Sequence, residues 1–238
     1  RNSVPAKYDP PLSVNNGNDH PEQDELRRLA RIHDDQTYQD TGDPVIPTIG
    51  MVSHRVVDLY IPGRGIDFSF ERRYSSHGSG LNGQLEDGPL GFGWDHVYNA
   101  RVAIDQGGAK VTVHDGNGRE DVYTTTLPSH IYTAPRGTYT LFKFEAPSTH
   151  ILRNREGVRT YFENNLLSKI QDPEGNSLEF FHDENGKLDY VIDTMGRTID
   201  FAYDSVSGRL TSITDFRGRV VQYYYDGNGN LSSVRSPI

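Results

Sequence analysis

The sequence contains no cysteine, and Trp94 is its only tryptophan. Without cysteine, neither a disulfide bond nor a thiolate site can form, and the redox compartment is left undetermined. No apolar run approaches the roughly 20 residues that a membrane-spanning helix requires. Basic residues are also fewer than acidic ones: the chain has 24 Lys and Arg and 33 Asp and Glu, which gives a net charge of −9. Nucleic acid and anionic membrane surfaces are therefore poor partners, since both attract clustered basic residues.

Hydrophobic residues make up 34% of the chain, less than the roughly 45–50% of an ordinary globular domain. Disorder would explain the shortfall, but the 14 Tyr and 10 Phe argue against it, because disordered segments lack aromatic residues. A β-sheet with one face in solvent explains it better, since only alternate side chains in its strands need to be apolar.

The composition divides the chain into three segments. Residues 1–43 are polar and rich in proline, and we expect a lead-in that plugs or links the sheet behind it, with a short helix over residues 21–34. Residues 44–165 are predicted to form an opening β-module, and residues 166–238 a repeat-built sheet. The chain begins without Met and stops after Ile238, where the next turn of the repeat is due, so we expect a fragment of a longer protein.

Alternation of apolar and polar residues predicts strands throughout the opening module. The clearest pair flanks a Pro- and Gly-containing turn over residues 62–65. The predicted strands are 56–61, 66–70, 98–104, 110–114, 120–125, 138–144, 150–153 and 159–163.

A tandem repeat with a period of about 21 residues begins after Leu166. Four leucines mark it, with spacings of 21, 22 and 21 residues: Leu167, Leu188, Leu210 and Leu231. Each period contains two turns that begin with Asp and end with Gly. The turn residues are Asp172 and Gly175, Asp183 and Gly186, Asp193 and Gly196, Asp204 and Gly208, Asp215 and Gly218, and Asp226 and Gly229. Because Asp accepts bonds from nearby N–H groups and Gly takes a positive φ, each turn is predicted to close an antiparallel hairpin.

Between these turns the apolar residues recur at every second position, which places them on one face of the sheet. They are Leu178, Phe180, His182, Ile199, Phe201, Tyr203, Val221, Tyr223 and Tyr225. We therefore expect an all-β fold, built as an antiparallel β-meander with one face rich in aromatic residues.

The repeat resembles the YD repeat of RHS and teneurin-like proteins, in which an aromatic–Asp pair is followed by Gly, then Arg or Asn, then Leu. The matches are Tyr203-Asp204 with Gly208-Arg209-Leu210 and Tyr225-Asp226 with Gly229-Asn230-Leu231, whereas His182 departs at the aromatic position. The upstream region resembles the module that opens RHS repeat arrays. The stretches that match are 42–45, 58–63, 72–74 and 88–94.

This resemblance implies a spiralling β-shell. In bacterial polymorphic toxins such shells enclose a C-terminal toxic domain, and in animal teneurins the comparable structure belongs to a cell-adhesion receptor. About a dozen strands at about 4.8 Å spacing give an arc of about 60 Å, and the corresponding ring, about 20 Å across, is filled by side chains. We therefore expect the segment to enclose nothing without further sheet from its parent protein or partners.

A group of aromatic and basic residues forms the candidate binding site: Trp94, Phe92, Arg72, Arg73 and Tyr74. Aromatic and guanidinium planes suit the faces of sugar rings, so a sugar-stacking platform is one interpretation. The other is that Trp94 anchors the core of the opening module, and we favour this second interpretation.

No catalytic residue, metal site or cofactor is predicted. The zinc motif H-E-x-x-H is absent, and His182 occupies the aromatic position of the repeat, so packing explains it better than metal binding. Residues 75–80 contain Ser and His but lack the G-x-S-x-G pattern of a nucleophile elbow.

The leading hypothesis is a structural segment of a large secreted or surface protein of a bacterium, and not an enzyme. Its expected partners are the remaining repeats of the parent protein or an enclosed C-terminal domain. Two alternatives remain open: an adhesion module that binds carbohydrate or a cell-surface protein, and an enzyme whose site is assembled from residues remote in sequence.

Overall fold

The computed structural model describes residues 45–46, 51–76 and 85–237, and their regular secondary structure is entirely β-strand. These residues belong to one compact unit, Pro44–Ile46 with Gly50–Ile238. The lead-in and its predicted helix over residues 21–34 lie outside the described residues.

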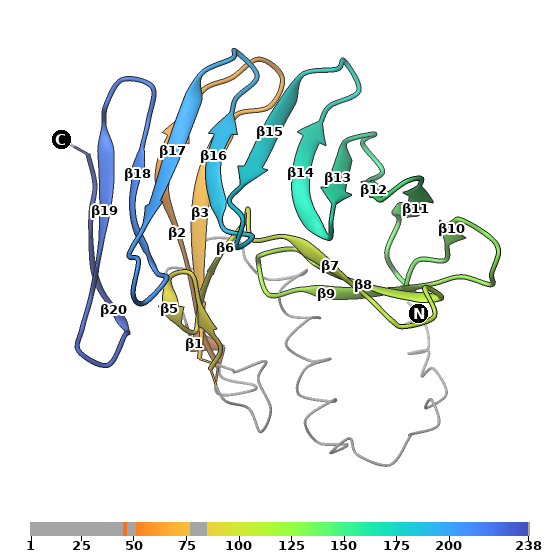
Figure 1. The fold of residues 1–238 in the computed structure, drawn as a ribbon, viewed down its shortest axis with the longest axis horizontal. Coiled ribbons are helices and arrows are strands. Elements are labelled where there is room, and N and C mark those ends of the chain that lie inside the picture. Colours follow the sequence, from red (N-terminus) through yellow and green to blue (C-terminus); the bar gives the residue numbers. More distant parts are fainter. Residues whose placement is uncertain (1–44, 47–50, 77–84, 238) are drawn as a thin grey trace, which may run out of the picture. The chain divides into compact units, whose positions relative to one another are not determined.

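The large sheet contains fourteen strands, and β10 to β20 follow one another in sequence order as an antiparallel meander (Figure 1). The all-β meander predicted from the sequence is therefore confirmed. The strands of this meander are β10 (Ile131–Tyr132), β11 (Leu141–Glu145), β12 (Thr149–Arg153), β13 (Arg159–Glu163), β14 (Leu166–Gln171), β15 (Ser177–His182), β16 (Leu188–Ile192), β17 (Thr198–Tyr203), β18 (Leu210–Thr214), β19 (Val220–Tyr225) and β20 (Leu231–Arg235).

Three earlier strands join this sheet as a branch at β14. They are β7 (Arg101–Ile104), β8 (Lys110–His114) and β9 (Glu120–Thr124). Arg101 of β7 pairs with Leu166 of β14, and an isolated bridge between Thr124 and Thr133 connects the end of β9 with the residue after β10. The sequence does not predict the branch, because β7 and β14 are distant in the chain.

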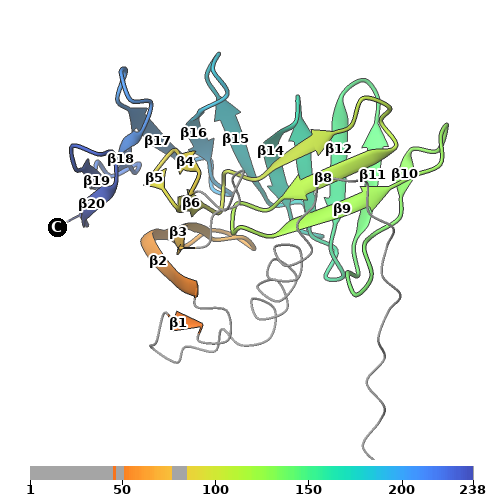
Figure 2. The same cartoon turned by 90° about the horizontal axis from the view of Figure 1, so that it is seen from below.

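The opening module also forms a four-stranded sheet, here called the module sheet. It consists of β1 (Val45–Ile46), β2 (Met51–Ile61), β3 (Phe68–Ser75) and β6 (Trp94–His96), in that order. Figure 2 shows β2 and β3 side by side, next to the small hairpin of β4 (Asp87–Gly88) and β5 (Gly91–Phe92). A shift in the register of β2 and β3 between Val57 and Leu59 leaves Asp58 as an extra residue.

The predicted strand positions agree with the structure to different degrees. Strands 110–114 and 159–163 have the predicted bounds. The strand predicted from residue 98 begins at Arg101, because Asn99 first forms a turn in which its N–H donates to the carbonyl of His96. The strand predicted from residue 138 begins at Leu141, because Thr138 is tied to the carbonyl of Pro135 in a turn. Strands β1, β4, β5, β6 and β10 were not predicted.

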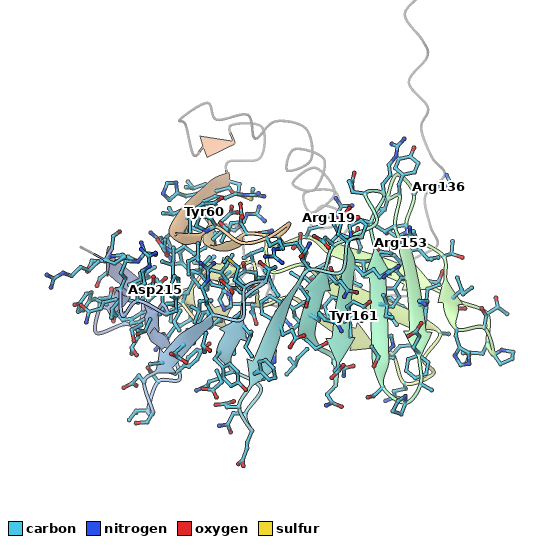
Figure 3. The ribbon with its side chains drawn as sticks, turned by 90° about the horizontal axis from the view of Figure 1, so that it is seen from above. Tyr60, Arg119, Arg136, Arg153, Tyr161 and Asp215 are labelled. Carbon is cyan, nitrogen blue, oxygen red and sulfur yellow. The ribbon has the colours of Figure 1, made fainter. Side chains whose placement is uncertain are left out.

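The Asp-to-Gly turns of the repeats form as predicted. In all six turns the N–H of the Gly donates to the carbonyl of the Asp at 2.9–3.2 Å, and the φ of the Gly lies between 75° and 94°. The side chain of Asp215 (labelled in Figure 3) accepts from the N–H groups of Arg217 and Arg219 at 2.8 and 2.9 Å. Each hairpin is thus closed by its own turn residues, which sets the register of the strands that follow.

Candidate functional site

The repeats give the large sheet the apolar face that the sequence predicts. Six side chains of β15, β17 and β19 are buried on it: Leu178, Phe180, Ile199, Phe201, Val221 and Tyr223. The residues at the strand ends, His182, Tyr203 and Tyr225, are half-buried. Asp200 and Gln222, which alternate with the buried set, are exposed, so the two faces of the sheet differ sharply in polarity.

The module sheet packs on this apolar face. The ring of Phe70 in β3 has no exposed surface and lies 5.7 Å from the ring of Phe201 and 6.4 Å from that of Tyr223. Tyr98, just after β6, lies 4.9 Å from the ring of Phe180. Such contacts between aromatic rings contribute about 0.5–1.5 kcal/mol each beyond the burial of their area, so the module and the repeats share one hydrophobic core.

A buried charged group also links the module to the repeats. Arg72 Nε donates to Asp58 Oδ2 at 2.8 Å, and the hydroxyl of Tyr223 donates to the same oxygen at 3.0 Å. Burial raises the pKa of the Asp58 carboxyl, and the charge and hydrogen bond of Arg72, with the Tyr223 hydroxyl, oppose that rise. The register shift in β2 makes Asp58 the extra residue that carries this carboxylate. Of its two partners, Arg72 belongs to the module sheet and Tyr223 to the large sheet.

Polar contacts at both ends of the repeat strands hold the same interface. Arg209, before β18, donates from Nη2 to both carboxylate oxygens of Asp87 at 2.7 Å. At the other end of the strands the N–H of Arg64 donates to the hydroxyl of Thr194 at 2.7 Å. The two contacts lie in turns at opposite ends of the strands, so they fix how the module is oriented on the repeats.

Three of the five predicted binding residues come together. The guanidinium carbon of Arg72 lies 4.4 Å from the centroid of the Trp94 ring, and the rings of Tyr74 and Trp94 are 5.3 Å apart. Trp94 is partly buried and packs against the core. One face of its indole is thus occupied by Arg72, whose Nε is in turn held by Asp58.

The other two predicted binding residues lie elsewhere. Arg73 is 7% exposed and directs its Nε towards the hydroxyl of Ser53 at 3.3 Å. Phe92 lies beside Arg209, with 5.8 Å between the guanidinium carbon and the ring centroid. Binding of sugar by the group around Trp94 stays a prediction.

Several interface residues were missed as site residues. Asp58 stands in a stretch that resembles the opening module and Arg209 in one that resembles the repeat, and His96 and Tyr98 follow the only tryptophan. No local pattern indicates their partners, because Asp58 and Tyr223 are 165 residues apart in the chain.

Comparison with known families identifies both regions. Residues 203–237, which contain Tyr203-Asp204 and Tyr225-Asp226, match the RHS Repeat family. The chain carries an RHS repeat. Residues 42–123, which include the module sheet, strands β7 and β8 and most of β9, match DUF6531, a domain of unknown function. No curated protein matches the chain. The RHS repeat match therefore covers β18 to β20 of the large sheet, and the DUF6531 match covers the module sheet that packs on its apolar face.

The residues that the structure describes contain no helix long and apolar enough to cross a membrane. In the same part of the chain, no three His, Cys, Asp or Glu side chains are grouped so that they could hold a metal ion.

Replacement of Tyr223 by Phe is expected to lower the free energy of unfolding by about 2 kcal/mol, since it removes a hydrogen bond to a buried carboxylate. Urea unfolding measures the change. Tyr224→Phe is the matched control, because the neighbouring hydroxyl donates to Gln222 on the exposed face, and its loss should cost less than about 0.5 kcal/mol. Equal losses in the two variants would show that the link to Asp58 does not stabilise the interface.

Proposed function

We propose that this chain is a structural segment of a β-shell, and that the shell of its parent protein encloses or presents another domain, such as a toxic one. The RHS repeat makes it a structural repeat protein, and the packing of its two regions supports a role as a wall of such a shell.

The observation that carries the proposal is the incomplete burial of the last repeat. Leu210 and Ile213 of β18 have no exposed surface. Their equivalents one period later, Leu231 and Val234 of β20, are only half-buried. Within the described residues, β20 pairs with β19 alone. A further strand in the same register would bury both side chains and satisfy the free edge.

The position of the module sheet indicates which part of the shell this is. A shell needs an unoccupied inner face to hold a domain, but Phe70 and Tyr98 fill the apolar face of the repeats. We therefore assign the segment to a closed end of the shell, with the chamber formed by sheet beyond β20. The partners are then the further repeats and the domain that they surround.

We place the parent protein outside a bacterial cell or on its surface, where RHS-repeat proteins are typically found. Fractionation of the producing cells tests this location.

Protease protection tests the enclosure. The product of the complete gene is digested with trypsin, and the polypeptide downstream of Ile238 is followed by mass spectrometry. We expect it to survive at least about tenfold longer in the intact protein than when it is produced alone, because proteolysis of a sequestered domain requires opening of its container. Phe70→Ala, which removes the central ring of the interface, is expected to shorten this protection.

Phe181→Ala is the control for that experiment, because its ring lies on the other face of the sheet and is 36% exposed. It should leave protection unchanged. Equal digestion rates for the downstream polypeptide in the intact protein and alone would overturn the proposal.

A further inference from the structure

A pocket of about 330 Å³ lies between the module and the repeats, and the role of the sheet as a wall does not explain it. The segment from β6 onwards supplies His96 and Tyr98 to its lining, and the ends of two repeat hairpins supply His182, Lys187 and Ser207. Its volume lies near the lower end of the about 300–1,000 Å³ that is usual for small-molecule sites. The pocket is therefore large enough to receive a small ligand.

The imidazole of His96 is buried beside this pocket without a hydrogen-bond partner on its Nδ1. His96 is 2% exposed, and its ring packs on Phe70 with 5.0 Å between centroids. Its backbone N–H donates to Asp95 Oδ1 at 2.8 Å, but its ring Nδ1 forms no hydrogen bond within the described chain. Buried polar groups are nearly always paired, and an unpaired one costs about 1–3 kcal/mol. Because the unpaired Nδ1 belongs to a residue that lines a pocket, a ligand in the pocket would supply the missing partner.

Lys187 supplies a positive charge to the pocket. Its Nζ lies 5.4 Å from the centroid of the Tyr203 ring and forms no ion pair with the residues that the structure describes. Hydrogen bonds made within their own turns, and then the charge of Lys187, lower the pKa of the Asp183 and Asp204 carboxyls. Asp204 accepts from the N–H groups of Val206 and Ser207. Asp183 accepts from two backbone N–H groups of its own turn, and Asp87 is paired with Arg209. The pocket thus offers a cation to an incoming anion.

Both histidines of the pocket are neutral near pH 7. Burial, together with the nearby His182, lowers the pKa of His96 to about 3. Burial also lowers the pKa of His182, although Asp183 acts in the opposite direction. A neutral imidazole offers one donor and one acceptor, which matches a hydroxyl group better than a second negative charge.

We propose that this pocket binds an acidic monosaccharide, whose carboxylate pairs with Lys187 and whose hydroxyl groups bond to His96 and His182. Tyr98 and Tyr203 also line the pocket and provide aromatic surface for the sugar ring. A metal ion fits less well, because zinc takes at least three protein ligands and the described residues contain no such group. The site does not depend on enclosure of a domain by the shell.

Titration of the purified chain with glucuronate, galacturonate and N-acetylneuraminate tests the proposal, with calorimetry for affinity and imidazole ¹⁵N NMR for position. We expect saturable binding of at least one of these acids, with shifted resonances of His96 and His182. Glucose, which lacks the carboxylate, and acetate, which lacks the ring, should each bind at least about tenfold more weakly. Lys187→Gln should weaken binding of the acid by about tenfold or more.

Lys169→Gln makes the same change of charge on the opposite face, where the Nζ of Lys169 lies 4.6 Å from the ring centroid of Tyr161, a residue labelled in Figure 3. It should leave binding unchanged. Circular dichroism checks that each variant is folded, and His182→Phe replaces Lys187→Gln if the latter is not. The proposal is overturned if none of the acids binds up to about 10 mM. It is equally overturned if acetate binds as tightly as the best sugar acid. It is also overturned if Lys187→Gln, or His182→Phe in its place, binds the acid as tightly as Lys169→Gln does.

Discussion

Replacement of Phe70 by Ala is expected to lower the free energy of unfolding by about 3–5 kcal/mol, the range for a large buried aromatic side chain. Its ring has no exposed surface and contacts aromatic rings of both sheets, Tyr98 from the module and Phe201 and Tyr223 from the repeats. The cavity left behind would lie at the centre of the shared core, where rigid strands on both sides limit its collapse. The change therefore tests whether module and repeats fold as one unit.

Trp94 makes this test selective, because the only tryptophan of the chain stands in the module sheet. Urea unfolding followed by its fluorescence reports on the module, and far-ultraviolet circular dichroism reports on all strands. In the unmodified protein the two transitions should coincide, and in Phe70→Ala both should move together to lower urea. Phe181→Ala is the control, since its ring is 36% exposed and stacks on Tyr190, and it should cost about 1 kcal/mol. A fluorescence transition that shifts alone would show that the module unfolds independently of the repeats.

The repeat region could be predicted from the sequence because its signals are local. Each Asp-to-Gly turn contains the groups that close it, and alternation between turns decides which side chains are buried. Leu178, Ile199 and Val221 are accordingly buried on one face, with Asp200 and Gln222 exposed on the other.

The interface could not be predicted, since its partners are remote and carry no shared pattern. A sequence shows that the repeats have an apolar face, but not that Phe70 covers it. The bond between Asp58 and Tyr223 spans 165 residues, and the Asp58 carboxylate takes part only because a register shift in β2 makes it the extra residue. Tertiary packing, which local propensity does not encode, decides such contacts.

The aromatic position of the repeat shows where local reasoning reaches its limit. His182 stands where other periods have Tyr203 and Tyr225, and packing was its expected role. All three side chains are half-buried, so the position lies at the rim of the core. At such a rim a polar ring is tolerated, and His182 becomes part of a pocket wall beside Lys187.

Acid is expected to lower the free energy of unfolding because His96 is buried in its neutral form. His96→Phe should remove much of this loss of stability. Burial lowers the pKa of His96 to about 3 from the 6.5 of a free histidine. Because the folded-state pKa is the lower one, the stability from the neutral ring is fully present above about pH 6.5 and is lost as the pH falls towards 3, by about 1.4 kcal/mol per pH unit. Between about pH 7 and pH 4.5 this amounts to about 3 kcal/mol. Phe has no proton to take up, and it keeps an aromatic ring against Phe70.

The neighbouring Asp95 acts in the opposite sense, so the comparison must be made between variants and not from one pH profile. Burial raises the pKa of Asp95 to about 6, and its contribution to stability is therefore lost as the pH rises through that value. Asp95 is present in both proteins, hence the difference between wild type and His96→Phe in urea unfolding at about pH 7 and pH 4.5 isolates the imidazole. His182→Phe, which replaces a half-buried ring, should recover a smaller part of the stability that the wild type loses in acid. Parallel losses of stability in wild type and His96→Phe would mean that the buried imidazole is not what makes the folded state sensitive to acid.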